Sequence, residues 1–379
     1  MATEPVVRAE PGYGAVADAF LTNFTEHGEV GAAFCLYRDG RPVVDAWGGI
    51  ADPVSGRTWQ ENTLALMFSA TKGPTALAVH LLAERGVLDL DTPVAKYWPE
   101  FGAAGKEHIP VRWVMSHRAG IAAVDADLTL HEVFAWDPVI EAIAAQAPQW
   151  EPGTAVGYHA RTFGWILGEV VRRITGQRFG GFFAREIAAP LGLDFWIGLP
   201  EEEEERVAVV LPDQMPGRDF FTGESLMVRV MSGPSGLFAY NDMWNRRDLH
   251  AAEMPSSNGI GDARSLARVY AATIGDVDGM RLLRPETVER AAALEAEETD
   301  LVIGVPTRVG TGLHLGAGLG PGVGPRSFGH PGAGGSTAWA DPEAGIAFAY
   351  VANKMRMNPA GEGDPRTVGL TRAVYAAIG

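Results

Sequence analysis

The feature that most constrains the fold of this chain is the position of its strand signals, which lie near both ends. Residues 31–49 predict two strands around an Asp39–Gly40 turn, and the segment STAWADPEAGIAFAYVANK predicts a hairpin that turns at Asp341–Gly345. Residues 90–300 carry mostly helical signals, interrupted by proline and glycine. A helical block inserted between two strand-rich ends predicts one α/β lobe built from both ends of the chain and one helical lobe built from its middle.

These signals place the two lobes along the chain. We expect residues 1–90 and 300–379 to form the α/β lobe and residues 91–299 to form the mostly helical lobe, with a functional cleft between them. Several helices have clear ends. A helix is expected from Ser69 to Arg85, and TFGWILGEVVRRITG and PRTVGLTRAVYAAIG predict two more; DARSLARVYAATIG adds a fourth, with an aspartate N-cap.

Composition excludes several classes of function. The 379 residues are 46% hydrophobic, which is enough for a substantial core. The net charge of −16 argues against partners that are nucleic acids or anionic membrane surfaces, because both need clustered Lys and Arg. Cys35 is the only cysteine and lies in an apolar run, so it predicts a small core residue and excludes an intrachain disulfide. No secretory signal or membrane span is seen in the sequence, and a cytoplasmic location is expected.

The first candidate for chemistry is the segment Ser69-Ala-Thr-Lys72, the one S-x-x-K in the chain. Three residues of helix would bring the hydroxyl and the amine onto one face. Ser69 would then lie at a helix N-terminus, where free N–H groups favour a developing oxyanion. Burial among apolar neighbours would lower the pKa of Lys72, as a general base requires. The alternative is an ordinary polar helix start, since this motif is short.

Tyr158 and His330 are the other two candidates. Tyr158 follows a loop rich in glycine and proline and precedes a helix, so its hydroxyl could face a cleft, where a nearby lysine cation would stabilise the phenolate. The alternative is a packed core tyrosine. His330 opens the segment His-Pro-Gly-Ala-Gly-Gly, whose small residues would let a substrate carbonyl approach backbone N–H groups. The alternative is a glycine-rich turn.

Other segments carry weaker signals. The glycines in residues 310–324 predict a strand and loop instead of a nucleotide site, because no helix pattern follows them. The acidic run Glu201–Glu205 predicts a solvated face. Residues 253–261 could line the cleft through Ser257 and Asn258 or form a plain turn.

Taken in order, these elements resemble the serine β-lactamase and penicillin-binding-protein superfamily, and within it the class C β-lactamase-like serine esterases, or family VIII carboxylesterases. The resemblance implies a β-lactamase-like α/β (α+β) fold, with an antiparallel sheet flanked by helices and an inserted, mostly helical lobe. It covers nearly the whole chain and is carried by SATKGPTALAVHLLAERGVLDLDTPVAKYWPEF, VRWVMSHRAGI, YHARTFGWILGEVVRRITG, PLGLD and FGHPGAGGSTAWADPEAG.

The resemblance also implies roles for single residues. Ser69 would be the acylated nucleophile, with Lys72 and Tyr158 as its proton relay. The backbone N–H groups of Ser69 and Ala333 would form the oxyanion hole. His330 and Gly332 would contact substrate, since His330–Pro331–Gly332 takes the place of the K-T-G motif of β-lactamases. No metal or cofactor is implied.

Two departures from the lactamase pattern favour esters. Tyr158-His-Ala160 lacks the amide of Y-x-N, and His330 replaces a lysine that would recognise a β-lactam carboxylate. We therefore expect a serine carboxylesterase that hydrolyses small to medium carboxylic esters. The alternatives are an acyltransferase, a β-lactamase or a DD-peptidase with the same residues, or a non-catalytic binding protein of the same fold. The oligomeric state is left open.

Overall fold

A large antiparallel sheet forms the frame of the protein, as seen in a computed structural model that describes residues 4–215, 223–357 and 362–379. The strand order is β1-β3-β2-β14-β13-β12-β11-β10-β9, and β4 pairs with β3. The strands are β1 (Val6–Ala9), β2 (Gly31–Arg38), β3 (Arg41–Asp52), β4 (Arg57–Thr58), β9 (Ala296–Thr299), β10 (Pro306–Val309), β11 (His314–Leu315), β12 (Phe328–Pro331), β13 (Thr337–Asp341) and β14 (Ile346–Ala352).

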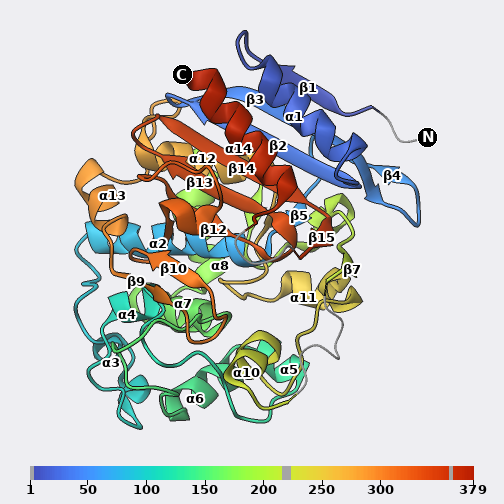
Figure 1. Cartoon of the computed structure of the whole chain (residues 1–379). Coiled ribbons are helices and arrows are strands. Elements are labelled where there is room, and N and C mark those ends of the chain that lie inside the picture. Colours follow the sequence, from blue (N-terminus) through green and yellow to red (C-terminus); the bar gives the residue numbers. More distant parts are fainter. Residues whose placement is uncertain (1–3, 216–222, 358–361) are drawn as a thin grey trace.

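The two predicted hairpins are confirmed, and a third pairing joins the ends of the chain. β2 and β3 turn at Asp39 and Gly40, both of which have positive φ, as a tight two-residue turn requires. β13 and β14 form the second hairpin. Between them β14 pairs with β2, from Ile346 opposite Arg38 to Ala352 opposite Ala32. This central pairing is what makes one sheet from the two ends (Figure 1).

Each face of the sheet is covered by helices because alternate side chains of its strands are apolar on both sides. Phe34 and Leu36 of β2 pack in one core with α1 (Gly14–Thr25) and α14 (Pro365–Ile378), which lie together on that face in Figure 1. Cys35 of the same strand is fully buried in the opposite core, which also contains residues of α12 (Ala263–Ile274) and α2 (Lys72–Glu84), so the prediction of a small core residue is confirmed.

The middle of the chain is mostly helical. Its longest helix, α7 (Thr162–Thr175), ends at left-handed Gly176 as expected. The other helices are α3 (Val94–Tyr97), α4 (Val111–Met115), α5 (Leu130–Phe134), α6 (Asp137–Ala145), α8 (Phe179–Phe183), α9 (Ala189–Leu191), α10 (Leu226–Ser232), α11 (Arg247–Ala251) and α13 (Pro285–Ala291), with the π-helical turn η3 (Ala184–Ala188). In Figure 1 the helices α3 to α7 and α10 lie below α2, whereas α12 and α13 lie above it.

Short elements complete the described fold. Two small sheets contain β5 (Ala65–Leu66), β8 (Ile260–Gly261) and β6 (Phe195–Trp196), and β15 (Lys354–Arg356) with β7 (Leu211–Gln214). The 3₁₀ turns are η1 (Phe68–Thr71), η2 (Pro99–Gly102), η4 (Glu201–Arg206), η6 (Asp242–Asn245), η7 (Gly316–Leu319) and η8 (Ala333–Gly335). The glycine run from 310 to 324 thus contains β11 and η7. The glutamates of η4 are exposed or half-buried, as predicted.

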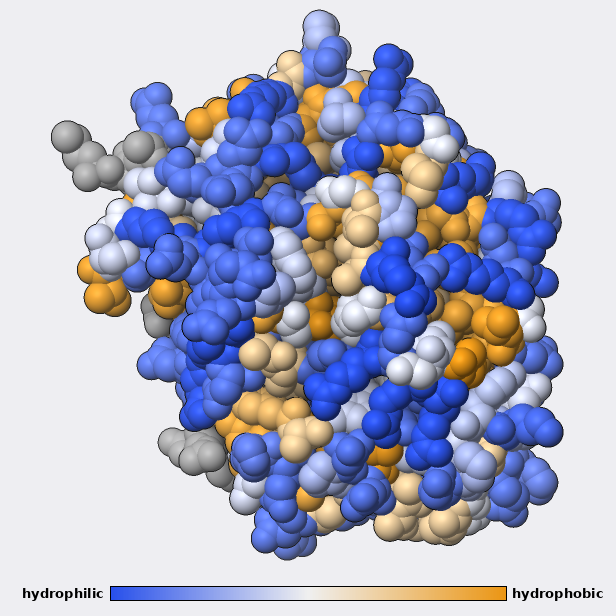
Figure 2. All heavy atoms as spheres, turned by 180° about the vertical axis from the view of Figure 1, so that it is seen from behind, coloured by the Kyte–Doolittle hydropathy of each residue, from blue (hydrophilic) through white to orange (hydrophobic). Residues whose placement is uncertain are grey.

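The division of the chain into two lobes at residues 90 and 300 stays a prediction. The edge strand β9 already begins at Ala296, before residue 300. In addition, α12, from the middle of the chain, packs against β2 and β14. In the described parts of the chain, no helix combines the length and apolar character needed to cross a bilayer. Hydrophilic residues cover most of the face seen in Figure 2, with hydrophobic residues in patches among them. The cytoplasmic location also stays a prediction.

Candidate active site

Ser69 lies in a tight turn between β5 and α2. After β5, Phe68 adopts a positive φ of 47°, which is an uncommon conformation for a non-glycine residue. The Phe68 ring packs against the rings of Tyr240 and Trp244. The expected α-helix from Ser69 to Arg85 is wrong at its start: residues 68–71 form the 3₁₀ turn η1, and α2 begins at Lys72. Pro74 accounts for part of this difference because it has no N–H to bond the Ala70 carbonyl.

The structure brings Ser69, Lys72 and Tyr158 together. The Nζ atom of Lys72 lies 3.2 Å from Ser69 Oγ. The Tyr158 hydroxyl donates a hydrogen bond of 2.7 Å to the same Oγ. Tyr158 reaches this position from the loop before α7. Ser69 Oγ is therefore held between an amine and a phenol that are far apart in the sequence.

The surroundings of Lys72 favour its neutral form. Its side chain is fully buried, and burial, helped by the charge of Arg161, holds the pKa of the amine well below its usual range. Nζ also lies 2.7 Å from the Ala160 carbonyl oxygen and 2.9 Å from the Ser256 carbonyl oxygen. A neutral amine has two N–H bonds and one lone pair. The two carbonyls can accept both N–H groups, which leaves the lone pair facing Ser69.

Tyr158 is also neutral, which corrects the expectation of a stabilised phenolate. Burial raises the pKa of its hydroxyl, although the Ser69 hydrogen bond opposes this shift. A neutral Lys72 offers no cation to stabilise a phenolate, which is why the expectation fails. The backbone of Tyr158 is fixed by buried Asp300, whose Oδ1 accepts the N–H groups of Tyr158, Val302 and Ile303. Tyr158 is thus positioned as a hydrogen-bond donor.

The segment His330–Pro331–Gly332 lies directly beside the turn that carries Ser69. A Cβ atom on Gly332 would be 2.3 Å from the Met67 carbonyl oxygen, so only glycine allows the two backbones to approach this closely. Neither the Ser69 N–H nor the Ala333 N–H donates a hydrogen bond to another residue in the described parts of the chain. Both N–H groups are therefore free to bind an acceptor.

His330 is buried and uncharged. Burial and the nearby His314 and Lys72 hold its pKa well below the usual range of a histidine. Its Nδ1 lies 2.7 Å from the Pro331 carbonyl oxygen and so carries the proton, while Nε2 has no partner among the described residues. No fixed positive charge therefore stands where the lactamase pattern has a lysine.

The departure at Tyr158-His159-Ala160 has a structural explanation. His159 is fully buried, with Nδ1 donating to the Gly157 carbonyl at 2.6 Å and Nε2 accepting the Ile121 N–H at 3.2 Å. Ala160 has no amide side chain, and its backbone carbonyl contacts Lys72 instead.

Several residues of the site were not identified from sequence patterns. In residues 253–261 the predicted cleft residues were Ser257 and Asn258, but Asn258 is fully buried and binds the backbone of its own loop, as a turn residue does. The Ser256 carbonyl is the group that reaches Lys72. Arg161 and Asp300 also lack a sequence signature, since their hydrogen bonds go to backbone atoms.

Comparison with known proteins identifies the class. The Beta-lactamase family model matches residues 16–373, so the chain belongs to the beta-lactamase family. The expected β-lactamase-like α/β fold is confirmed, with a TM-score of 0.89 to the crystal structure of a family VIII carboxylesterase, which is 39% identical and is matched over 98% of this chain and all of that one.

Two further relatives are similar over most of the chain. The esterase/beta-lactamase LipL of Mycobacterium tuberculosis is 37% identical over 364 residues, which span 92% of this chain and 82% of LipL. A penicillin-binding-protein homologue from Caulobacter crescentus is 36% identical with a TM-score of 0.89, over 99% of this chain and all of that one. These relatives confirm the resemblance to esterase- and β-lactamase-like serine hydrolases and support a hydrolase with serine esterase activity.

Proposed function

We propose that this protein is a carboxylesterase that hydrolyses small to medium carboxylic esters through an acyl-enzyme on Ser69. The observation that carries the proposal is the position of Ser69 Oγ, 3.2 Å from the Lys72 amine and 2.7 Å from the Tyr158 hydroxyl. A serine needs an adjacent base to become a nucleophile, and a buried, neutral lysine is such a base.

In the acylation step, Ser69 Oγ attacks the ester carbonyl carbon and its proton moves to the free amine of Lys72. The carbonyl oxygen becomes an oxyanion that accepts hydrogen bonds from the N–H groups of Ser69 and Ala333, each worth about 3 kcal/mol in comparable sites. The C–O bond to the alcohol then breaks, and Tyr158 gives its proton to the departing alkoxide. The Lys72 ammonium stabilises the resulting phenolate.

Deacylation reverses these proton transfers. Water attacks the acyl carbon and gives a proton to the Tyr158 phenolate. Ser69 Oγ leaves and recovers a proton from the Lys72 ammonium. One ester and one water thus become one acid and one alcohol, and the free amine and phenol are restored. No step requires a metal or a cofactor.

Esters are favoured over β-lactams by the charge of the site. His330 is neutral and Ala160 has no side-chain amide, so two groups that would bind an anionic lactam are missing. Lactam hydrolysis is the second candidate activity because the relative LipL is named both an esterase and a β-lactamase. An acyltransferase, a DD-peptidase and a non-catalytic binding protein are the remaining alternatives.

The test compares p-nitrophenyl esters of graded acyl length with nitrocefin, using Ser69→Ala as the control. We expect short acyl chains to be hydrolysed much faster than nitrocefin, and Ser69→Ala to lose both activities. Faster nitrocefin turnover would refute the ester assignment. Product analysis with an added alcohol acceptor would detect acyl transfer. Failure of Ser69 to react with a fluorophosphonate would support a binding protein.

A further inference from the structure

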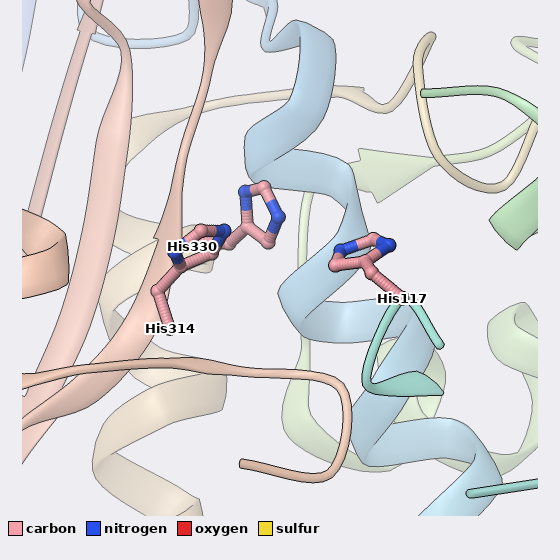
Figure 3. Close-up of side chains that lie close together, drawn as sticks. All are labelled: His117, His314 and His330. Carbon is pink, nitrogen blue, oxygen red and sulfur yellow. The ribbon is translucent and has the colours of Figure 1, made fainter. Parts of the chain in front are cut away.

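Three buried histidines lie together beside the site and take no part in the reaction described above as acids or bases. His117 follows α4, His314 is on β11 and His330 is on β12. Figure 3 shows the three rings gathered next to a helix, with His314 and His330 on the neighbouring strands and His117 on a separate loop. One ring nitrogen from each residue lies within 4.8 Å of the others. We call these residues the histidine cluster.

Hydrogen bonding leaves part of this cluster unsatisfied, in contrast to two other buried histidines. His159 and His250 have hydrogen-bond partners for both ring nitrogens, and His80 has one for Nε2. In contrast, His330 Nε2 is buried and has no hydrogen-bond partner among the described residues. A buried polar atom without a partner is unfavourable, so this nitrogen is suited to a ligand that the protein itself does not provide.

The chemistry of the cluster indicates which ligand. Each of the three residues offers one imidazole nitrogen to a common point, and no carboxylate belongs to the set. A set of imidazoles without a carboxylate suits zinc and similar transition metals and is poor for magnesium or calcium, which prefer oxygen ligands.

We propose that His314 and His330, with His117 as a third ligand, bind a divalent transition-metal ion of the zinc class. His330 has the arrangement expected of a ligand, because its Nδ1–H is held by the Pro331 carbonyl and its Nε2 lone pair is left open. The rings of His314 and His330 are perpendicular, with centroids 4.6 Å apart. The fourth position of a tetrahedral ion would be open to water or another small ligand.

The three ligands are not equivalent. Nitrogens on a tetrahedral zinc ion lie roughly 3.3 Å apart, so rings now within 4.8 Å must rotate toward the ion. His117 Nδ1 accepts the His159 N–H at 3.2 Å, which places the ring proton on Nε2. For Nε2 to bind the metal, that proton must move and the contact with His159 must be lost. His314 and His330 therefore contribute most of the affinity and His117 less.

The ion would lie next to the proposed active site without entering its reaction. The His117 ring is 5.0 Å from the Tyr158 ring, and the His330 ring is 6.3 Å from it. This inference does not depend on the proposed function, because it concerns binding of an ion and not turnover of an ester.

The test uses direct metal binding to the purified full chain. Cobalt(II) absorption spectra and zinc titration calorimetry would be measured for the unchanged protein, for His314→Ala and for His108→Ala. His108 is the matched control because its side chain is 90% exposed and lies outside the cluster. We expect one ion per chain, a cobalt spectrum typical of tetrahedral nitrogen ligation, affinity about tenfold or more weaker in His314→Ala, and no change in His108→Ala.

Two results would overturn the proposal: absence of stoichiometric binding, or binding that His314→Ala leaves unchanged, which would indicate ions bound elsewhere on the surface. Ester turnover without added metal and thermal unfolding would show that each variant is folded. If His314→Ala does not fold, His314→Asn, which keeps a buried polar group, takes its place. His117→Ala should weaken binding less than the His314 variant.

Discussion

Gly332→Ala tests the close approach between the segment of His330 and the turn that carries Ser69. The added Cβ would meet the Met67 carbonyl oxygen at 2.3 Å, whereas ordinary contacts of a Cβ begin at 3.4 Å. The two backbones must therefore separate by about 1 Å, the difference between these distances. This movement would displace the Ala333 N–H from the Ser69 N–H. Loss of one oxyanion donor costs about 10²–10³ in kcat, so we expect kcat to fall roughly a hundredfold or more.

The assay is steady-state hydrolysis of a short p-nitrophenyl ester, together with the rate of fluorophosphonate labelling, which depends on the same two N–H groups. Gly369→Ala is the control, because a Cβ at this α14 position has no neighbour within 4 Å. The control should keep full activity and be more stable by about 0.5–1 kcal/mol. A folded Gly332→Ala variant with unchanged kcat would refute the assignment of Ala333 to the oxyanion hole.

Three further predictions concern Tyr158, Lys72 and Arg366. Tyr158→Phe should lower kcat by about 10²–10⁴ with little change in KM, because it removes only the proton donor to the alkoxide; a large rise in KM alone would contradict this role. Turnover needs the free amine of Lys72, whose pKa is lowered in the folded protein, so kcat should be constant at alkaline pH and fall as the pH drops through that lowered value. A pH profile that rises only near the ordinary lysine pKa of about 10.4 would be the contrary result. Arg366→Met should lower the free energy of unfolding in urea by about 3–5 kcal/mol, because it leaves the buried carboxylates of Glu29 and Asp364 without their cation, and a loss under about 1 kcal/mol would show that the ion pairs contribute little.

Local signals in the sequence were sufficient for much of the fold. The Asp39–Gly40 turn, the glycine end of α7 and the aspartate cap of α12 are each set by a few neighbouring residues, and the structure confirms all three. The order of strands at both ends and helices between them predicted the fold class, which the comparisons confirm.

The candidate site was harder to predict from the sequence, because many of its contacts use backbone atoms. The carbonyls of Ala160 and Ser256 orient the amine of Lys72, yet a carbonyl is present in every residue and has no pattern in a sequence. The 3₁₀ turn at Ser69 depends on the positive φ of Phe68, which tertiary contacts decide. The histidine cluster combines residues from distant segments, so only the folded chain brings it together.

The pairing of β14 with β2 has a consequence for the time at which activity can arise during synthesis. The turn that carries Ser69 is made early, but the segment beside it belongs to β12, which is held in the sheet through β13 and β14. A nascent chain whose β14 segment has not yet emerged from the ribosome lacks this support. Ester turnover would therefore appear abruptly, late in translation, and its onset would report closure of the sheet.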